Sequence, residues 1–219
     1  MSLSNTAIPS SQPGGSGIYI HIPYCRQACH YCNFHFSVYQ GNREEFVKSL
    51  LTEIELQKDF LPSGESYGSK KKLDTIYLGG GTPSILPAQE LMLIFEKLAD
   101  YYHFDDLTEI TLEANPDDLT PAKLSELGQT PVNRLSIGIQ SFHEPDLRYM
   151  NRIHSSDEAL KVIADARAAG FSNLTVDLIY GPSAHRPRSR PPWRCLYAAE
   201  KPRQWMKNRA PASSRCSWS

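Results

Sequence analysis

Five short apolar runs recur along the chain, separated by stretches in which polar residues dominate. They are "GIYIHI" (17–22), "DTIYLGG" (74–80), "EITLEA" (109–114), "RLSIGIQ" (134–140) and "NLTVDLIYG" (173–181). Runs of this length between turn-forming residues are typical of strands. Several are apolar nearly throughout, as expected of parallel strands whose sheet is covered by helices.

Helical patterns fill the intervals between these predicted strands. They span residues 42–60, 87–102, 120–128 and 155–170. In the first, apolar residues follow one another at roughly helical spacing, at Phe46, Leu50, Ile54 and Leu56. Alternating strands and helices predict an α/β fold with parallel pairing, which we interpret as the beginning of a (β/α) barrel with five βα units. A doubly wound sheet is the competing architecture.

Two local patterns add detail to this fold. Thr120 is the expected N-cap of the third helix, with Pro121 at its first position and Gly128 as its stop. The segment "PSGESYGSKKK" (62–72) is predicted to be a polar linker, with its lysines in a solvated loop.

The two ends of the 219-residue chain differ from its middle. Residues 1–16 are small and polar and predict a flexible leader, not a signal peptide. The chain has no apolar stretch of the roughly 20 residues that a membrane span needs. We therefore expect a cytoplasmic protein in a reducing setting, where clustered cysteines bind metal more often than they form disulfides.

Residues 182–219 have a composition of their own. They carry nine of the 23 Lys and Arg but one of the 24 Asp and Glu, with all three Trp and six of the 16 Pro. No strand pattern is present there, so the segment is predicted to be disordered or out of frame. The domain expected to fold is 17–181, which makes the barrel incomplete at its C-terminal side. Nucleic-acid binding by the basic segment is the less favoured alternative.

Residues 25–32, "CRQACHYC", hold three of the five cysteines. Thiolates are soft ligands that suit zinc or an iron–sulfur cluster. For zinc, the fourth ligand would be His21, His30 or His35. Three cysteines on a [4Fe–4S] cluster would instead leave one iron open to a small molecule.

Polar residues also stand at the carboxyl ends of the later predicted strands. A glycine turn, "LGGGTPS" (78–84), follows the second strand, and Glu113, Gln140 and Asp177 lie in or at the end of the next three. In a barrel, the carboxyl ends of the parallel strands meet at one end, where the active site lies. Taken alone, the glycines indicate a tight strand-to-helix turn, and the alternative for Asp177 is a buried salt bridge.

These motifs together resemble the oxygen-independent coproporphyrinogen III oxidase family of the radical S-adenosylmethionine (SAM) superfamily. The resemblance covers about residues 17–181 and rests on "YIHIPYC", "YLGGGTPS", "EANP", "SIGIQSF", "NRIHS" and "VDLIYG", with a C-x3-C-x2-C run after the first strand. It implies a [4Fe–4S] cluster on Cys25, Cys29 and Cys32, with SAM chelating the fourth iron. In that family the reduced cluster cleaves SAM to a 5′-deoxyadenosyl radical.

The resemblance also assigns SAM contacts, residue by residue. Tyr19 would pack near the cluster and SAM, and Tyr31 would offer backbone contact to adenine. Gly80, Gly81 and Thr82 would approach SAM. Glu113 would bind the polar groups of SAM, and Arg152 would bind a carboxylate. Gln140 and Asp177 would bind the ribose hydroxyls. Without the family, Arg152 is as well explained by a surface ion pair, and no catalytic residue is assigned.

One position separates branches of the family. The oxidases typically have a further cysteine two residues after the third ligand, where this chain has Phe34. That resembles the HemW-type haem chaperones, so a chaperone is expected, with haem or porphyrin as ligand. An electron donor such as a flavodoxin and haem-receiving respiratory proteins would be its partners. A porphyrin-forming oxidase and a zinc-binding module are the alternatives.

Overall fold

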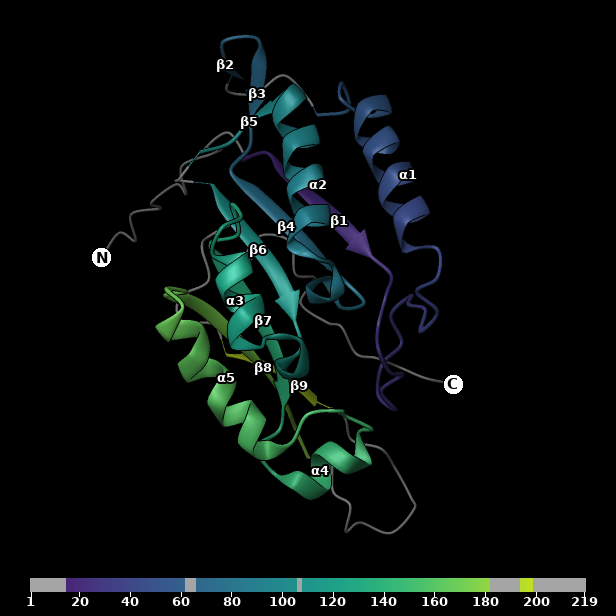
Figure 1. Cartoon of the computed structure of the whole chain (residues 1–219), viewed down its shortest axis with the longest axis vertical. Helices are drawn as coiled ribbons and strands as arrows, with labels where there is room; N and C mark the ends of the chain where they lie inside the picture. The colour runs from purple at the N-terminus through teal and green to yellow at the C-terminus, as the bar shows by residue number, and fades with distance from the viewer. Residues whose placement is uncertain (1–14, 62–65, 106–107, 182–193, 199–219) are drawn as a thin grey trace, which may run out of the picture.

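A six-stranded sheet forms the centre of the computed structural model, which describes residues 15–61, 66–105, 108–181 and 194–198. The spatial order of its strands follows the order of the chain (Figure 1). The strands are β1 (Gly17–Ile22), β4 (Thr75–Gly80), β6 (Glu109–Ala114), β7 (Arg134–Gln140), β8 (Asn173–Tyr180) and β9 (Arg194–Ala198). The first five are parallel and agree with the predicted strands to within one residue.

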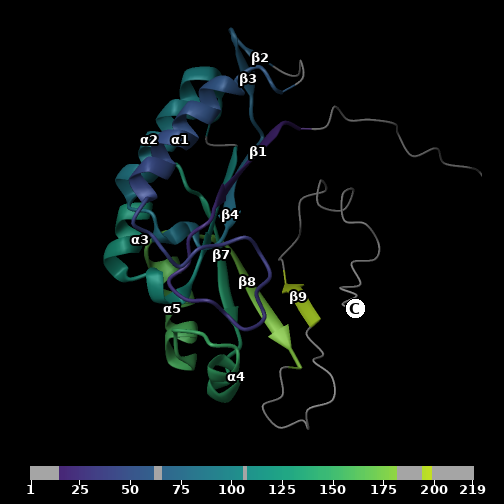
Figure 2. The ribbon, with the colours of Figure 1, turned by 90° about the vertical axis from the view of Figure 1, so that its right-hand side faces the viewer.

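The helices of the chain cover one face of this sheet (Figure 2). They are α1 (Arg43–Leu56), α2 (Ala88–Tyr101), α3 (Pro121–Leu127), α4 (Glu144–Tyr149) and α5 (Ser156–Ala168), with short 3₁₀ turns η1 (Pro83–Ile85) and η2 (Pro116–Asp118). A doubly wound sheet has helices on both faces and a reversal in strand order. The described part of the chain has neither, so that alternative is wrong and the sheet is part of a barrel wall. The helix α4 was not predicted.

Helix ends follow the expected chemistry. Thr120 Oγ1 accepts a hydrogen bond from the Lys123 amide at 3.2 Å, as predicted for an N-cap. Ser155 and Glu158 form a reciprocal capping box at the start of α5. Of the apolar residues at helical spacing in α1, Leu56 is 77% exposed in the last turn, and the buried residues of the helix are Val47 and Ile54.

The apolar core lies between the sheet and the helices. Alternate strand residues such as Ile20, Leu78 and Ile110 are buried there in one cluster with residues of the helices, and each such side chain contributes about 1.5–3 kcal/mol by leaving water. Because strand side chains alternate between faces, the intervening residues project to the other face of the sheet. That open face carries Tyr19 and Glu113, and it positions the candidate site.

The predicted linker at 62–72 is wrong in part. Residues Ser66–Tyr67 (β2) and Lys70–Lys72 (β3) join Tyr102–His103 (β5) in a small second sheet. The lysines fit there because their apolar stems are half-buried while their ammonium groups reach backbone carbonyls. Lys70 Nζ donates to the Ala99 carbonyl and Lys71 Nζ to the Leu61 carbonyl.

The predicted absence of a strand beyond residue 181 is also wrong at one place. Arg194–Ala198 form β9, which pairs antiparallel with β8. The outer edge of β8 offers unpaired backbone groups, and a neighbouring segment satisfies them whatever its side-chain pattern. Its antiparallel direction means that β9 does not extend the βα repeat. Residues 1–14 of the predicted flexible leader and the rest of the predicted disordered segment at 182–219 lie outside the described residues. No helix in the described part of the chain is both long and apolar enough to cross a membrane.

Candidate cluster and cofactor site at the carboxyl ends of the strands

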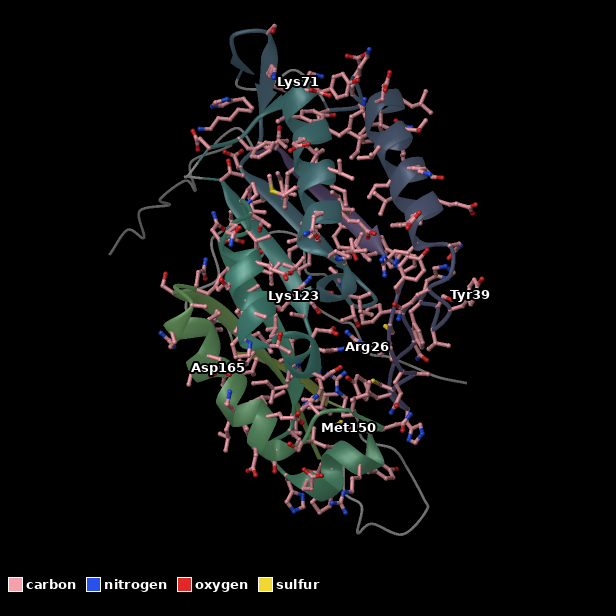
Figure 3. The ribbon with its side chains drawn as sticks, viewed as in Figure 1. Arg26, Tyr39, Lys71, Lys123, Met150 and Asp165 are labelled. Atoms are coloured by element: carbon pink, nitrogen blue, oxygen red, sulfur yellow. The ribbon has the colours of Figure 1, made fainter. Side chains whose placement is uncertain are left out.

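The three clustered cysteines lie in a loop that comes after β1. Backbone hydrogen bonds close this loop on itself, from the Cys25 amide to the Ser37 carbonyl at 3.0 Å. The loop is also attached to the segment between α4 and α5. The His30 amide donates to the Met150 carbonyl at 3.1 Å, and Asn151 Nδ2 donates to the Ala28 carbonyl at 2.7 Å. Figure 3 shows Met150 and Arg26 at this same end of the sheet.

Two of the sulfur atoms accept hydrogen bonds from distant parts of the chain. Thr82 Oγ1 donates to Cys25 Sγ at 3.3 Å, and Arg152 Nη1 donates to Cys29 Sγ at 3.4 Å. Burial raises the pKa of the Cys25 thiol, and the Thr82 hydrogen bond counteracts it. Burial likewise raises the pKa of Cys32. Both donors favour the thiolate, which is the form that binds metal.

The thiol ligands bear on the kind of metal that this loop could hold. In a zinc site, Zn–S bonds of about 2.3 Å bring sulfurs to within roughly 4 Å of one another. No three His, Cys, Asp or Glu side chains gather closely enough for one metal ion among the residues that the structure describes. A [4Fe–4S] cluster binds each thiolate through a different iron, so it needs the sulfurs further apart. Three thiolates are donors that an iron–sulfur cluster takes, and zinc is the alternative for the same soft ligands.

The glycine turn after β4 is packed directly against the cysteine loop. The Gly81 amide donates to the Ile22 carbonyl at 2.8 Å, and the Thr82 amide donates to the Tyr24 carbonyl at 2.7 Å. A Cβ at Gly81 would stand 2.6 Å from the Tyr24 carbonyl oxygen. Gly80 has φ +112°, which L side chains rarely adopt. This turn therefore requires glycine for close approach as well as for its conformation.

Glu113 lies beside this turn on the open face. Its Oε1 accepts from Tyr77 at 2.7 Å, and its Oε2 accepts from the Gly80 amide at 3.1 Å. Burial nevertheless raises the pKa of Glu113. Tyr19, 58% exposed, stacks on Tyr77 with ring centroids 5.9 Å apart. A carboxylate and an accessible aromatic ring thus stand next to the glycine turn.

Asp177 and Gln140 come from the last two parallel strands of the described region. Burial, followed by repulsion from Glu113, raises the pKa of Asp177 to about 6. Its Oδ1 is buried without a hydrogen-bond partner among the described residues. Gln140 ends β7 with φ +66°, beside Gly138. Asp177 therefore has an unused acceptor on the side of the sheet where the site is predicted.

Arg152 connects the cysteine loop to the sheet. In addition to Cys29, its guanidinium donates to the Tyr31 hydroxyl at 3.2 Å, to Asn115 Oδ1 at 2.6 Å and to the Gly138 carbonyl at 2.8 Å. Its Nε is buried and has no partner within the described part of the chain. These partners are not a surface ion pair, so the alternative explanation of Arg152 is wrong.

Several polar residues around Arg152 were not singled out from the sequence. They are Asn115, Asp117 and Asp118 in "EANPDD", His154 in "NRIHS", and Arg26. Their signal was present in the motifs, which place polar residues directly after apolar strands. Burial lowers the pKa of His154 to about 4, so its imidazole is neutral near pH 7, and its Nε2 faces the Ile139 carbonyl at 2.9 Å.

A separate cavity lies at the edge of the sheet, between β1 and α1. It has a volume of about 590 Å³ and mainly apolar walls, among them Phe46, Leu50 and Leu98. Tyr19 and His21 border it, whereas the cysteines, Thr82 and Glu113 do not. The candidate site is therefore on the open face of the sheet and not in this cavity.

Comparison with known proteins places this arrangement in a family. Residues 19–184 match the family model described as "Radical SAM superfamily". The chain is 37% identical over 163 residues to "Heme chaperone HemW" of Lactococcus lactis, covering 74% of this chain and 40% of that protein. It is 34% identical over 180 residues to the bovine mitochondrial "Radical S-adenosyl methionine domain-containing protein 1", covering 81% and 39%.

Similarity extends to a solved structure. The coproporphyrinogen III oxidase HemN from Escherichia coli, described as a radical SAM enzyme, superposes with a TM-score of 0.65 at 27% identity. The match covers 74% of this chain and 36% of that one. The chain thus spans about 40% of the length of the curated relatives it matches. The family implies a [4Fe–4S] cluster and SAM, and it agrees with the partial barrel and the cysteine motif. This chain belongs to the radical SAM superfamily.

Proposed function

We propose that Cys25, Cys29 and Cys32 hold a [4Fe–4S] cluster and that SAM binds beside it on the open face of the sheet. The observation that carries this proposal is the pair of donors to two sulfurs, Thr82 from the glycine turn and Arg152 from beyond β7. Thiolates that bind iron carry negative charge, and these donors are placed to stabilise it. When bound, such a cluster supplies an electron for reductive cleavage of SAM.

The remaining residues of the site provide the polar groups that SAM requires. Glu113 presents a carboxylate for an ammonium, and Arg152 presents a buried cation for a carboxylate. Asp177, with its unpartnered Oδ1, and Gln140 offer acceptors and donors for ribose hydroxyls. The Gly80–Gly81 backbone allows close approach, Tyr19 provides aromatic surface, and Tyr31 offers its backbone to adenine. These assignments rest on the family resemblance and on the location of the residues in the parallel strands and in the loops that follow them.

For the protein as a whole, we propose a HemW-type haem chaperone. Support comes from Phe34, which stands where oxidases of the family have a cysteine and is 70% exposed in the cysteine loop. Relatives from Lactococcus lactis and Bacillus subtilis, at 37% and 36% identity, carry the name "Heme chaperone HemW". Haem is thus the proposed ligand, respiratory haem proteins are the proposed recipients, and a flavodoxin-like protein is the proposed electron donor.

Coproporphyrinogen III oxidase activity is the second candidate. It is favoured by the similarity to HemN and by a relative from Bradyrhizobium diazoefficiens, 30% identical over 174 residues, which is named as that oxidase. Here the cluster would serve radical decarboxylation of propionate side chains. Phe34 is the observation that ranks this candidate below the first.

Anaerobic reconstitution with iron and sulfide, followed by two assays, separates the candidates. Haem titration should produce a saturable shift in the haem absorption band. Incubation with coproporphyrinogen III, SAM and a reductant should give no protoporphyrinogen IX. Robust conversion of coproporphyrinogen III would reverse the ranking. Cys195→Ala and Cys216→Ala are matched controls for Cys29→Ala, and they should retain the cluster that Cys29→Ala loses.

A further inference from the structure

The Asn115 side chain lies between the two groups that donate to the cysteine sulfurs. Its Oδ1 accepts from Arg152 Nη2 at 2.6 Å, and its Nδ2 donates to Thr82 Oγ1 at 3.2 Å. Arg152 donates onward to Cys29 Sγ, and Thr82 donates onward to Cys25 Sγ. One amide therefore joins the donors of two proposed cluster ligands.

The next three residues of the chain hold the Asn115 backbone in place. Asn115 precedes Pro116, which favours the extended conformation observed at φ −98° and ψ 149°. The η2 turn then brings the Asp118 amide back to the Asn115 carbonyl at 3.1 Å. Asp118 is itself held by Arg26 Nε at 2.5 Å and by Ser84 Oγ at 2.8 Å. The Asn115 amide thus stands on a well-anchored turn.

The polarity of the amide determines the direction of the Thr82 hydrogen bond. A guanidinium has donors only, so Arg152 requires the oxygen of the Asn115 amide to face it. The amide nitrogen then faces Thr82 and donates to it. A hydroxyl has a single hydrogen, and with its oxygen already accepting from Asn115, that hydrogen is directed to Cys25 Sγ.

We propose that Asn115 is a positioning residue, which orients the Thr82 hydroxyl toward Cys25 and thereby sets the reduction potential of a cluster bound there. The inference rests on the proposed cluster. Hydrogen bonds to the sulfurs of an iron–sulfur cluster tune its potential, and donated hydrogens favour the more negative, reduced form. Asn115 itself needs no contact with cluster or SAM for this role.

Asn115→Asp replaces the group that donates a hydrogen bond to Thr82 with one that accepts from it. The carboxylate still pairs with Arg152, but it accepts from Thr82 and draws the hydroxyl hydrogen away from Cys25. The midpoint potential should therefore become more negative. The new charge also lowers the potential directly. A double-mutant cycle, completed by Thr82→Val and the double variant, therefore isolates the contribution of the hydrogen bond to the potential. Two variants are matched controls. Thr82→Ser keeps the hydroxyl, and Asn173→Asp makes the same amide-to-carboxylate change at the exposed amino end of β8.

The test is redox titration of the reconstituted full chain, followed by EPR, with iron content and thermal unfolding measured for each variant. Asn115→Asp and Thr82→Val should each lower the midpoint potential, and the double variant should fall short of their sum. The two controls should stay at the wild-type value. If Asn115→Asp does not fold, Asn115→Ala replaces it. This substitution must lower the midpoint potential of the wild-type chain and leave the midpoint potential of the Thr82→Val variant unchanged. Additive shifts, or no shift in Thr82→Val, would overturn the inference alone. A wild-type chain that takes up no iron and sulfide would instead overturn the proposed function, and the inference with it.

Discussion

Tyr77 donates its phenolic hydrogen to Glu113 across 2.7 Å, from one strand of the parallel sheet to the next. The contact lies on the open face, next to the glycine turn, and Tyr77 is also the residue on which Tyr19 stacks. Burial, followed by the charge of Glu113, raises the pKa of Tyr77, so the phenol keeps its hydrogen for this bond.

Replacing Tyr77 by Phe tests the strength of that contact. Glu113 would keep the Gly80 amide but lose its second donor while remaining buried. The free energy of unfolding should fall by about 1–3 kcal/mol at pH 7. Urea denaturation of the two proteins measures the difference, and an unchanged free energy would show that water replaces the phenol at no cost.

Asp177 gives the protein a specific pH dependence. Its pKa is about 6 in the folded chain, above its usual value of 3.8, because burial disfavours the carboxylate. Between these two values the folded state holds a proton that the unfolded state has lost. Stability from this group is therefore present below about pH 4 and is lost as the pH rises through 6.

Asp177→Asn should remove that loss. The variant should match the wild type near pH 4 and exceed it in free energy of unfolding at pH 7 by about 3 kcal/mol, from a shift of about two pKa units. Urea denaturation across this range provides the measurement, with exposed Asp59→Asn as the matched control. A constant difference between wild type and Asp177→Asn at all pH values would contradict the assignment.

Gly81 and Gly128 should respond in opposite ways to alanine. A Cβ at Gly81 meets backbone of Tyr24 at 2.6 Å, whereas one at Gly128 finds only ordinary contacts, and Gly128 has φ −63°. We expect Gly81→Ala to cost about 1–3 kcal/mol or more and to impair cluster assembly. Gly128→Ala should stabilise the chain by up to about 1 kcal/mol. Thermal unfolding and iron content of the two variants test this prediction, and equal effects of alanine at both sites would refute it.

Arg152 should matter for the shape of its guanidinium as well as its charge. Lysine keeps the charge but cannot reach Cys29, Tyr31 and Asn115 together. Loss of one charge-assisted hydrogen bond costs about 1.5–3 kcal/mol, so Arg152→Lys should weaken SAM binding on the order of tenfold or more. Equilibrium binding to the reconstituted protein measures this effect. Arg148→Lys, at an exposed ion pair with Glu144, is the control and should bind SAM as the wild type does.

The strands were predictable because each is a short apolar run whose every second residue must face the helices. That same periodicity placed Glu113 and Asp177 on the open face. The lysines of β3 and the strand β9 were not predictable, since pairing with a free backbone edge overrode their polar composition. Asn115 escaped prediction for another reason. Its role depends on Thr82 and Arg152, which are 33 and 37 residues away and meet only in the folded chain.

The response of the cluster to SAM tests the central claim most directly. The reconstituted, reduced protein should give a low-temperature EPR signal whose g values shift when SAM is added, because SAM would occupy the iron that lacks a cysteine. Cys25→Ala, Cys29→Ala and Cys32→Ala should each abolish the signal. A full iron and sulfide content with a signal that saturating SAM leaves unchanged would contradict the account.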